Sequence, residues 1–234
     1  MSGRLIAVGV GPGDPELITL KGARLIREAD VVIAPVGDNS TASVAHGIID
    51  GLVDPRRQQL LTRVFPMKKE LAEMRPFWEA AAVEVAGLLA QGKTVVFATL
   101  GDPFLYSTFL YFHQVFAERF PGAAVEVVPG ISSIHAAAAV AGRPLGLGAD
   151  RIAILPATFE QDRLRQTLRE FDTVVLMKVH RVFDQVRNLL RELGRLENAV
   201  YVRRVGLPGE TVIRDLDQIQ VEDLDYLSLV LVGK

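Results

Sequence analysis

The sequence predicts an α/β protein with two domains and largely parallel sheets. Short apolar runs of strand character alternate with segments of helical apolar spacing, and sharp glycine turns directly follow two of these runs. Nine such runs exceed the usual size of one sheet, and a Pro121-Gly122 break falls near the middle of the chain. We therefore expect an N-terminal α/β domain over residues 1–120 and a C-terminal α/β domain over residues 121–234.

The predicted strands are apolar and β-branched, and they lie at residues 5–10, 31–34, 60–65, 94–99, 125–128, 151–155, 173–178, 199–203 and 226–232. The predicted helices lie at residues 21–30, 43–52, 76–90, 132–141, 162–170 and 182–193, with another helix after residue 104. Ser43 can act as an N-cap, and Pro76 suits a first helical turn. This alternation is typical of parallel sheets.

The composition is that of an ordinary globular protein, because 49% of the residues are hydrophobic and 23% are charged. The chain has no cysteine, which excludes disulfides, cysteine zinc sites and thiol nucleophiles. The four histidines lack the spacing of metal ligands, so we expect no bound metal; they are His46, His113, His135 and His180.

The charge balance and the N-terminal segment argue against several partners. A net charge of −2 gives no general attraction to nucleic acid or to anionic membranes, so we expect neither as a partner. The first apolar run is soon interrupted by glycines and Asp14, which is typical of a strand rather than of a signal peptide or membrane span. We expect a soluble, cytoplasmic protein.

The tripeptide Gly-Asp-Pro occurs twice, at residues 13–15 and 101–103, and each copy lies where a predicted strand ends. In an open α/β sheet, ligands bind outside the carboxyl ends of the strands. Gly9 and Gly11 would let the backbone approach such a ligand closely. For either copy alone, an ordinary turn is the alternative interpretation.

The first glycine loop does not fit a nucleotide phosphate. Gly9-x-Gly11 follows a predicted strand, but the dinucleotide fingerprint requires a third glycine where this chain has Asp14. An aspartate there would repel a pyrophosphate, and the Gly-Lys-Ser/Thr of a Walker A loop does not follow. We expect this loop to approach a neutral or cationic ligand, or a second domain.

A third turn, Pro129-Gly130, follows the predicted strand at residues 125–128. Ser132 or Ser133 can cap the helix of small residues that comes next. The free N–H groups at such a helix N-terminus suit a carboxylate or a hydroxyl.

Four sequence blocks, taken in order, resemble those of the tetrapyrrole (corrin and porphyrin) methyltransferases: VGVGPGDPELITLKG, TLGDPFLYSTF, VVPGISS and VVLMKV. The resemblance spans nearly the whole chain. It implies S-adenosylmethionine as cofactor, S-adenosylhomocysteine as product, two α/β domains with the cofactor in the cleft between them, and a homodimer. Carried over by position, the cofactor contacts fall on Pro12, Leu100, Gly101, Asp102, Leu105, Ser132, Ser133, Met177, Val205 and Gly206. For Met177, core packing is the alternative.

The residues after the second Gly-Asp-Pro narrow the resemblance. Members that methylate uroporphyrinogen tend to continue with a Gly-Arg-Gly-Gly run, whereas this chain has FLYST at residues 104–108. That version, with LMKV at residues 176–179 and the extended segment 56–75, resembles the precorrin-2 C-20 methyltransferases. It implies methyl transfer to the nucleophilic meso carbon 20 of precorrin-2, or of its cobalt complex, in cobalamin biosynthesis. The alternatives are another ring carbon, a protein or RNA target, and a module that binds a tetrapyrrole or nucleoside without turnover.

Three side chains are candidate catalytic residues. Asp102 would orient the cofactor or place negative charge near the sulfonium, and its alternative is an Asx-type turn. Tyr106 could hydrogen-bond the macrocycle or pack as a helical aromatic. Lys178 could pair with a substrate carboxylate or turn to solvent at a strand end. Further substrate carboxylates call for arginines, each of which could equally be solvated, and the candidates are Arg143, Arg151, Arg181, Arg203 and Arg204.

Overall fold

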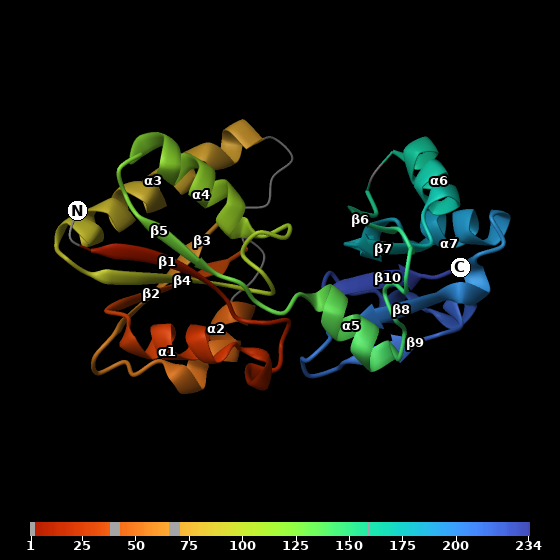
Figure 1. Cartoon of the computed structure of the whole chain (residues 1–234), viewed down its shortest axis with the longest axis horizontal. Helices are drawn as coiled ribbons and strands as arrows, with labels where there is room; N and C mark the ends of the chain where they lie inside the picture. Colours follow the sequence, from red (N-terminus) through yellow and green to blue (C-terminus); the bar gives the residue numbers. More distant parts are fainter. Residues whose placement is uncertain (1–2, 38–42, 66–70, 159) are drawn as a thin grey trace. The chain divides into compact units, whose positions relative to one another are not determined.

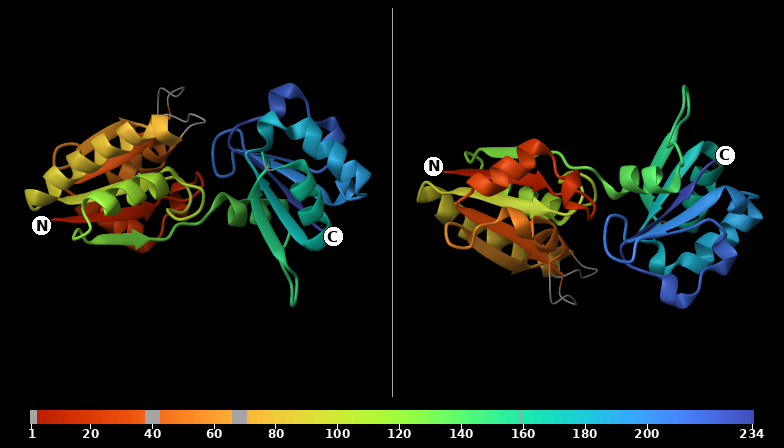
Figure 2. Two further views of the ribbon diagram at one scale, coloured as in Figure 1. Left: turned by 90° about the horizontal axis from the view of Figure 1, so that it is seen from above. Right: turned by 90° about the horizontal axis from the view of Figure 1, so that it is seen from below.

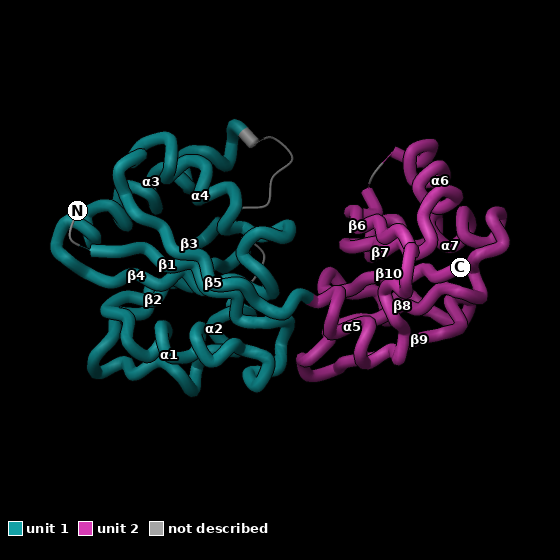
Figure 3. Tube along the Cα trace, viewed as in Figure 1, with its two compact units in different colours: residues 1–132 teal, residues 133–234 magenta. Residues whose placement is uncertain are grey.

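The computed structural model describes residues 3–37, 43–65, 71–158 and 160–234. The chain divides into two compact units, Met1–Ser132 and Ser133–Lys234 (Figure 3). Each unit has one five-stranded sheet with helices on both faces, so the fold class is α/β, as the sequence predicts (Figure 1, Figure 2). Among the helices of the described ranges, none is both long and apolar enough to span a bilayer.

The first sheet consists of parallel strands in the order β3-β2-β4-β1-β5. Their bounds are β1 Arg4–Gly9, β2 Val31–Val36, β3 Gln59–Val64, β4 Thr94–Thr99 and β5 Val125–Val128. Strand β1 pairs with β4 on one side and with β5 on the other. The carboxyl ends of these three neighbouring strands therefore lie together at one edge of the sheet.

Helices α1 and α2 cover one face of the first sheet, and α3 and α4 cover the other (Figure 1). Alternate residues of β1 pack into two cores: Leu5 and Ala7 pack on the α3 and α4 side, and Ile6 and Val8 on the α1 and α2 side. Burial on both faces explains why the inner strands β1, β2 and β4 are almost continuously apolar, whereas the edge strand β3 carries Gln59, Thr62 and Arg63. The helix bounds are α1 Leu20–Glu28, α2 Val44–Ile49, α3 Leu71–Ala90 and α4 Thr108–Arg119.

Two helix starts test the capping predictions. The Ser43 hydroxyl accepts a hydrogen bond from the His46 N–H at 3.2 Å, which confirms Ser43 as the N-cap of α2. Helix α3 begins at Leu71, so Pro76 lies inside the helix and not in its first turn. A proline there lacks an N–H, so the helix has one backbone hydrogen bond fewer.

The second sheet has the order β6-β7-β10-β8-β9 and is mixed. Strands β6 and β7 pair in parallel, whereas β10 is antiparallel to β7 and β8, and β9 is antiparallel to β8. Helices α6 and α7 pack on one face, and α5 contacts β8 and β10 on the other (Figure 1). The bounds are β6 Ile152–Pro156, β7 Thr173–Met177, β8 Ala199–Arg203, β9 Thr211–Ile213, β10 Ser228–Val232, α5 Ser133–Ala141, α6 Gln161–Glu170 and α7 Phe183–Glu192.

Short 3-10 segments complete the described structure: η1 Pro15–Leu17, η2 Asp50–Leu52, η3 Val179–Arg181, η4 Leu196–Asn198, η5 Leu216–Gln218 and η6 Val221–Asp223. Segment η1 lies on the loop after β1, behind residues 10–14, and η3 begins just after Lys178 at the end of β7. They therefore lie where a ligand is expected.

The prediction of largely parallel sheets is wrong for the second unit. The chain reaches β9 and β10 through turns and 3-10 segments rather than crossover helices, and such connections allow antiparallel pairing. The sequence pattern does not reveal β9, because three residues are too few to show a period. The units divide after Ser132 rather than near residue 120, because β5 pairs with β1 and so belongs to the first sheet.

Glycines bring the carboxyl ends of β1, β4 and β5 into backbone contact. The Gly101 N–H donates to the carbonyl oxygen of Gly11 at 2.8 Å, and the two residues form a β-bridge. A Cβ atom added to Gly130 would lie 2.2 Å from the Gly101 oxygen and 2.7 Å from the Gly9 Cα. A Cβ added to Gly9 would lie 2.6 Å from the Gly130 nitrogen. Only glycine therefore fits at positions 9 and 130.

We predict that Gly130→Ala lowers the free energy of unfolding by about 3 kcal/mol or prevents folding, because the new methyl group would overlap the Gly101 carbonyl. Gly87→Ala in α3 is the matched control, since an added Cβ there meets nothing within 4 Å. It should raise stability by about 0.5 to 1 kcal/mol. Urea unfolding measures both changes, and a Gly130→Ala protein of wild-type stability would contradict this packing.

Candidate functional site

The Asp102 carboxylate joins two loops at the carboxyl edge of the first sheet. Its Oδ1 accepts a hydrogen bond from the Phe104 N–H at 2.8 Å, and its Oδ2 accepts one from the Gly130 N–H at 3.0 Å. The first bond forms the Asx-type turn of the alternative interpretation. The second bond fixes the loop after β4 against the loop after β5. Asp102 therefore holds the loops after β4 and β5 together. A direct effect of its charge on a bound sulfonium stays a prediction.

The two Gly-Asp-Pro copies differ in what their carboxylates hold. Asp14 caps η1, where its Oδ1 accepts a hydrogen bond from the Glu16 N–H at 2.8 Å. That bond spans two residues, whereas the bond from Asp102 to Gly130 joins segments far apart in the sequence. The first copy shapes one turn, and the second copy connects two strands of the site.

The predicted cofactor contacts of the first unit lie on three adjoining loops, after β1, β4 and β5. Apart from Asp102, they contribute apolar side chains, one hydroxyl and backbone groups. Leu100 also packs partly against the core shared with α1 and α2. The set consists of Pro12, Leu100, Gly101, Asp102, Leu105 and Ser132, and Ser133 begins α5 in the second unit.

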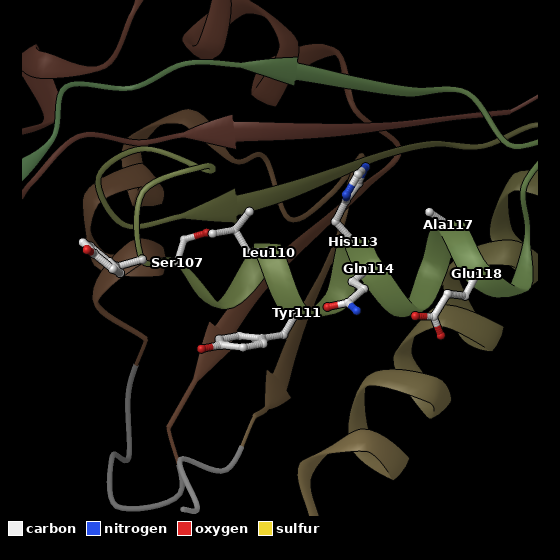
Figure 4. A pocket seen from close by; sticks show the side chains of 8 residues that line it. Ser107, Leu110, Tyr111, His113, Gln114, Ala117 and Glu118 are labelled. Carbon is white, nitrogen blue, oxygen red and sulfur yellow. The ribbon is translucent and has the colours of Figure 1, made fainter. Parts of the chain in front are cut away.

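Tyr106 precedes α4 and is 43% exposed, so the alternative of a buried helical aromatic is wrong. It lines a groove that continues along α4 past Tyr111 and Gln114 (Figure 4). The Tyr111 ring stacks on the buried Trp78 ring with centroids 5.0 Å apart. An aromatic and polar surface thus adjoins the loop that carries Asp102.

In the second unit, Met177 ends β7 and Lys178 follows it. Met177 is half-buried, and its carbonyl accepts a hydrogen bond from the Ala157 N–H at 2.7 Å. Lys178 is also half-buried, and burial lowers the pKa of its amine. No acidic side chain of the described ranges pairs with it. Lys178 is therefore not the fully solvated charge of the alternative interpretation.

His180 and Tyr226 lie at the same edge of the second sheet, with ring centroids 5.5 Å apart and edge-to-face. The His180 Nδ1 is buried and has no hydrogen-bond partner in the part of the chain described. Burial lowers the pKa of His180, the charge of Arg181 lowers it further, and Asp225 opposes both effects. The sequence does not single out Tyr226, because only the antiparallel direction of β10 brings it to the carboxyl end of β7.

Three of the five candidate arginines already have acidic partners. Arg151, Arg203 and Arg204 pair with Asp172, Asp223 and Asp225, at 3.8, 3.4 and 3.2 Å respectively. Arg143 and Arg181 have no ion pair among the residues that the structure describes. Of these two, Arg181 lies three residues after Lys178, in the segment that follows β7.

Three non-glycine residues of the described ranges have left-handed backbones: Tyr106, Lys178 and Arg204, with φ of 50°, 58° and 51°. This conformation costs a non-glycine residue about 1 kcal/mol or more. The three residues follow β4, β7 and β8 in the chain, and all lie in segments where the sequence predicts ligand contacts. Such strain gathers at functional sites, so it is independent support for these segments.

Comparison with known proteins finds relatives that match nearly the full length of the chain. The sequence model of the Tetrapyrrole (Corrin/Porphyrin) Methylases matches residues 4–219. The precorrin-2 C(20)-methyltransferase of Sinorhizobium sp is 35% identical over 98% of this chain and 95% of its own length. The cobalt-precorrin-2 C(20)-methyltransferase of Salmonella typhimurium is 34% identical over 100% and 98%. The cobalt-precorrin-4 C(11)-methyltransferase of Methanocaldococcus jannaschii is 26% identical over 99% and 87%.

Solved structures share the fold. The methyltransferase CobJ superimposes with a TM-score of 0.73 at 24% identity, covering 99% of this chain and 94% of that one. The uroporphyrin-III C-methyl transferase from Thermus thermophilus, complexed with S-adenyl homocysteine, gives 0.65 at 26% identity, covering 99% and 98%. Sequence and fold agree over almost the full length, and the chain belongs to the tetrapyrrole (corrin/porphyrin) methylase family.

Proposed function

We propose that the protein is an S-adenosylmethionine-dependent methyltransferase that methylates meso carbon 20 of precorrin-2, or of its cobalt complex, in cobalamin biosynthesis. The main support is its similarity, over both units, to C(20)-methyltransferases of two organisms at 34 and 35% identity. The relative that acts at carbon 11 matches almost as much of the chain at only 26% identity. Carbon 20 is therefore favoured over another ring position.

The loops of the first unit suit S-adenosylmethionine. They present backbone amides and carbonyls, the apolar side chains of Leu100 and Leu105, and the negative charge of Asp102. A nucleoside and an amino acid need hydrogen bonds to backbone and an apolar slot, and a sulfonium favours nearby negative charge. We propose the same contacts as in the resemblance, including those of Met177, Val205 and Gly206.

When bound, the cofactor would supply an activated methyl group on a positive sulfur. The residues of this chain would hold methyl and meso carbon in line and exclude water, which lowers the barrier without a strong base. We propose that Tyr106, whose left-handed backbone lies in the segment after β4, hydrogen-bonds the macrocycle. Loss of the proton from carbon 20 completes the reaction, and a neighbouring base would assist it.

The substrate carboxylates need cations that are not already neutralised. Lys178 and Arg181 meet this requirement, since neither forms an ion pair within the described ranges. We propose that they bind acetate or propionate groups of the tetrapyrrole. Charge-assisted hydrogen bonds of this kind are stronger than neutral ones.

We further propose a cytoplasmic homodimer. Strand β6 is an edge strand that begins with the exposed Ile152, close in sequence to Leu147, which is 82% exposed. An apolar sheet edge of this kind suits pairing with a second copy of the chain. Sedimentation equilibrium at micromolar concentration tests this, and a monomer mass would overturn it.

The function is tested by incubating the purified protein with S-adenosylmethionine and either precorrin-2 or its cobalt complex, in separate reactions. Mass spectrometry should show one added methyl group, and carbon NMR with a labelled methyl donor should place it on carbon 20. A methyl group on another carbon would support the alternative ring position. Tight tetrapyrrole binding without methyl transfer would instead support the non-catalytic module.

We predict that Lys178→Met raises the KM for the tetrapyrrole about tenfold with little change in kcat, because a charged binding partner is lost. The protonated amine is the binding form, so in the wild type KM should rise as pH increases through the lowered pKa of Lys178. The variant should lack this rise. Lys93→Met, a change of the same type before β4, is the control; an unchanged KM in Lys178→Met would exclude the role.

We predict that Asp102→Asn weakens S-adenosylhomocysteine binding about tenfold, because an amide nitrogen cannot accept the hydrogen bond from a backbone N–H. Asp14→Asn is the matched control, since one remaining oxygen can still accept the single bond that caps η1. Isothermal calorimetry measures both affinities. Wild-type affinity in Asp102→Asn would show that the link between the loops does not matter for binding.

A further inference from the structure

The segment between β8 and β9 consists of two consecutive tight turns. The Arg204 carbonyl accepts a hydrogen bond from the Leu207 N–H at 2.8 Å, and the Leu207 carbonyl accepts one from the Glu210 N–H at 3.0 Å. Gly206 and Gly209 occupy the third position of each turn, with φ of 73° and 87°. Type II turns require positive φ at this position. We call residues 204–210 the double turn.

The Arg204 side chain holds the double turn through two hydrogen bonds of its guanidinium. Its Nε donates to the Pro208 carbonyl at 2.8 Å, and its Nη1 donates to Asp225 Oδ2 at 3.2 Å. Asp225 is itself held, because its Oδ1 accepts a hydrogen bond from the Leu227 N–H at 2.7 Å. The guanidinium thus connects the second turn to the segment that enters β10. Lysine could not reproduce this fork.

The backbone conformation at position 204 does not require an arginine. The side-chain hydrogen bonds therefore explain why an arginine occupies this position. Its φ is 51°, in a region that glycine adopts without strain. Its N–H donates to the Leu227 carbonyl at 2.7 Å, which continues the antiparallel pairing of β8 and β10. A glycine could keep these backbone features but would lose both side-chain bonds.

We propose that Arg204 is a positioning residue for the cofactor: its guanidinium holds the double turn so that the backbone of Val205 and Gly206 can contact S-adenosylmethionine. This inference rests on the proposed function. It also corrects the interpretation of Arg204 as a ligand for substrate carboxylates, because Asp225 and Pro208 already engage its guanidinium. Glu210 also holds the double turn, because its Oε2 accepts a hydrogen bond from the Gly206 N–H at 2.7 Å. The proposed cofactor contact of Gly206 therefore involves its carbonyl and not its N–H.

Calorimetry with S-adenosylhomocysteine tests the proposal on the full chain. Arg204→Gly keeps the left-handed backbone unstrained, and Arg204→Lys keeps the charge; each should bind about tenfold more weakly than the wild type. Arg203→Lys is the matched control, because Arg203 is adjacent and pairs with Asp223 instead. It should bind within about twofold of the wild type. Thermal unfolding should show that Arg204→Gly is fully folded at the temperature of the calorimetry, so that its weaker binding does not reflect unfolding.

The outcomes separate this inference from the proposed function. A wild type that does not bind S-adenosylhomocysteine would overturn both. A wild type that binds, with Arg204→Gly equal to it, would overturn the inference alone. Asp225→Asn gives a second route: combined with Arg204→Gly, it should weaken binding no more than Arg204→Gly alone, because Arg204→Gly already removes the ion pair that Asp225→Asn breaks. Additive losses would contradict the proposed pairing.

Discussion

The contact among the loops after β1, β4 and β5 is the constraint on which the first unit depends. Gly9, Gly101 and Gly130 bring three backbone segments so close that a side chain at position 9 or 130 would overlap its neighbour. The Asp102 carboxylate then locks two of the loops by accepting an N–H from each side. The parallel sheet supplies this meeting point, because its three neighbouring strands end at one edge.

This close contact among the loops determines which kinds of ligand suit the carboxyl ends of β1, β4 and β5. The loops are held by glycines and by the half-buried carboxylate of Asp102, and they present backbone groups and apolar side chains. The negative charge of Asp102 would repel a phosphate. In the second unit, Lys178 and Arg181 follow β7 without acidic partners in the described ranges.

The sequence predicts the strands and helices well, because their apolar periods reflect which faces are buried. It does not predict strand direction, and so it misses the mixed second sheet and the position of Tyr226 beside β7. It identifies Asp102 from its motif. It does not show that the Asp102 carboxylate accepts a hydrogen bond from the Gly130 N–H, because Gly130 is distant in the sequence and no local pattern reveals this contact. Arg204 likewise looks like a substrate ligand until Asp225 is seen to pair with it.

The central claim is that the joined glycine loops of the first unit form the cofactor site. Amide hydrogen exchange with and without S-adenosylhomocysteine tests it directly, since ligand contact and reduced loop opening slow exchange. We expect slower exchange at residues 9–13, 101–105 and 130–132, with no change at the turn around Gly92 that precedes β4. Binding of the ligand without slower exchange at these three loops would contradict it.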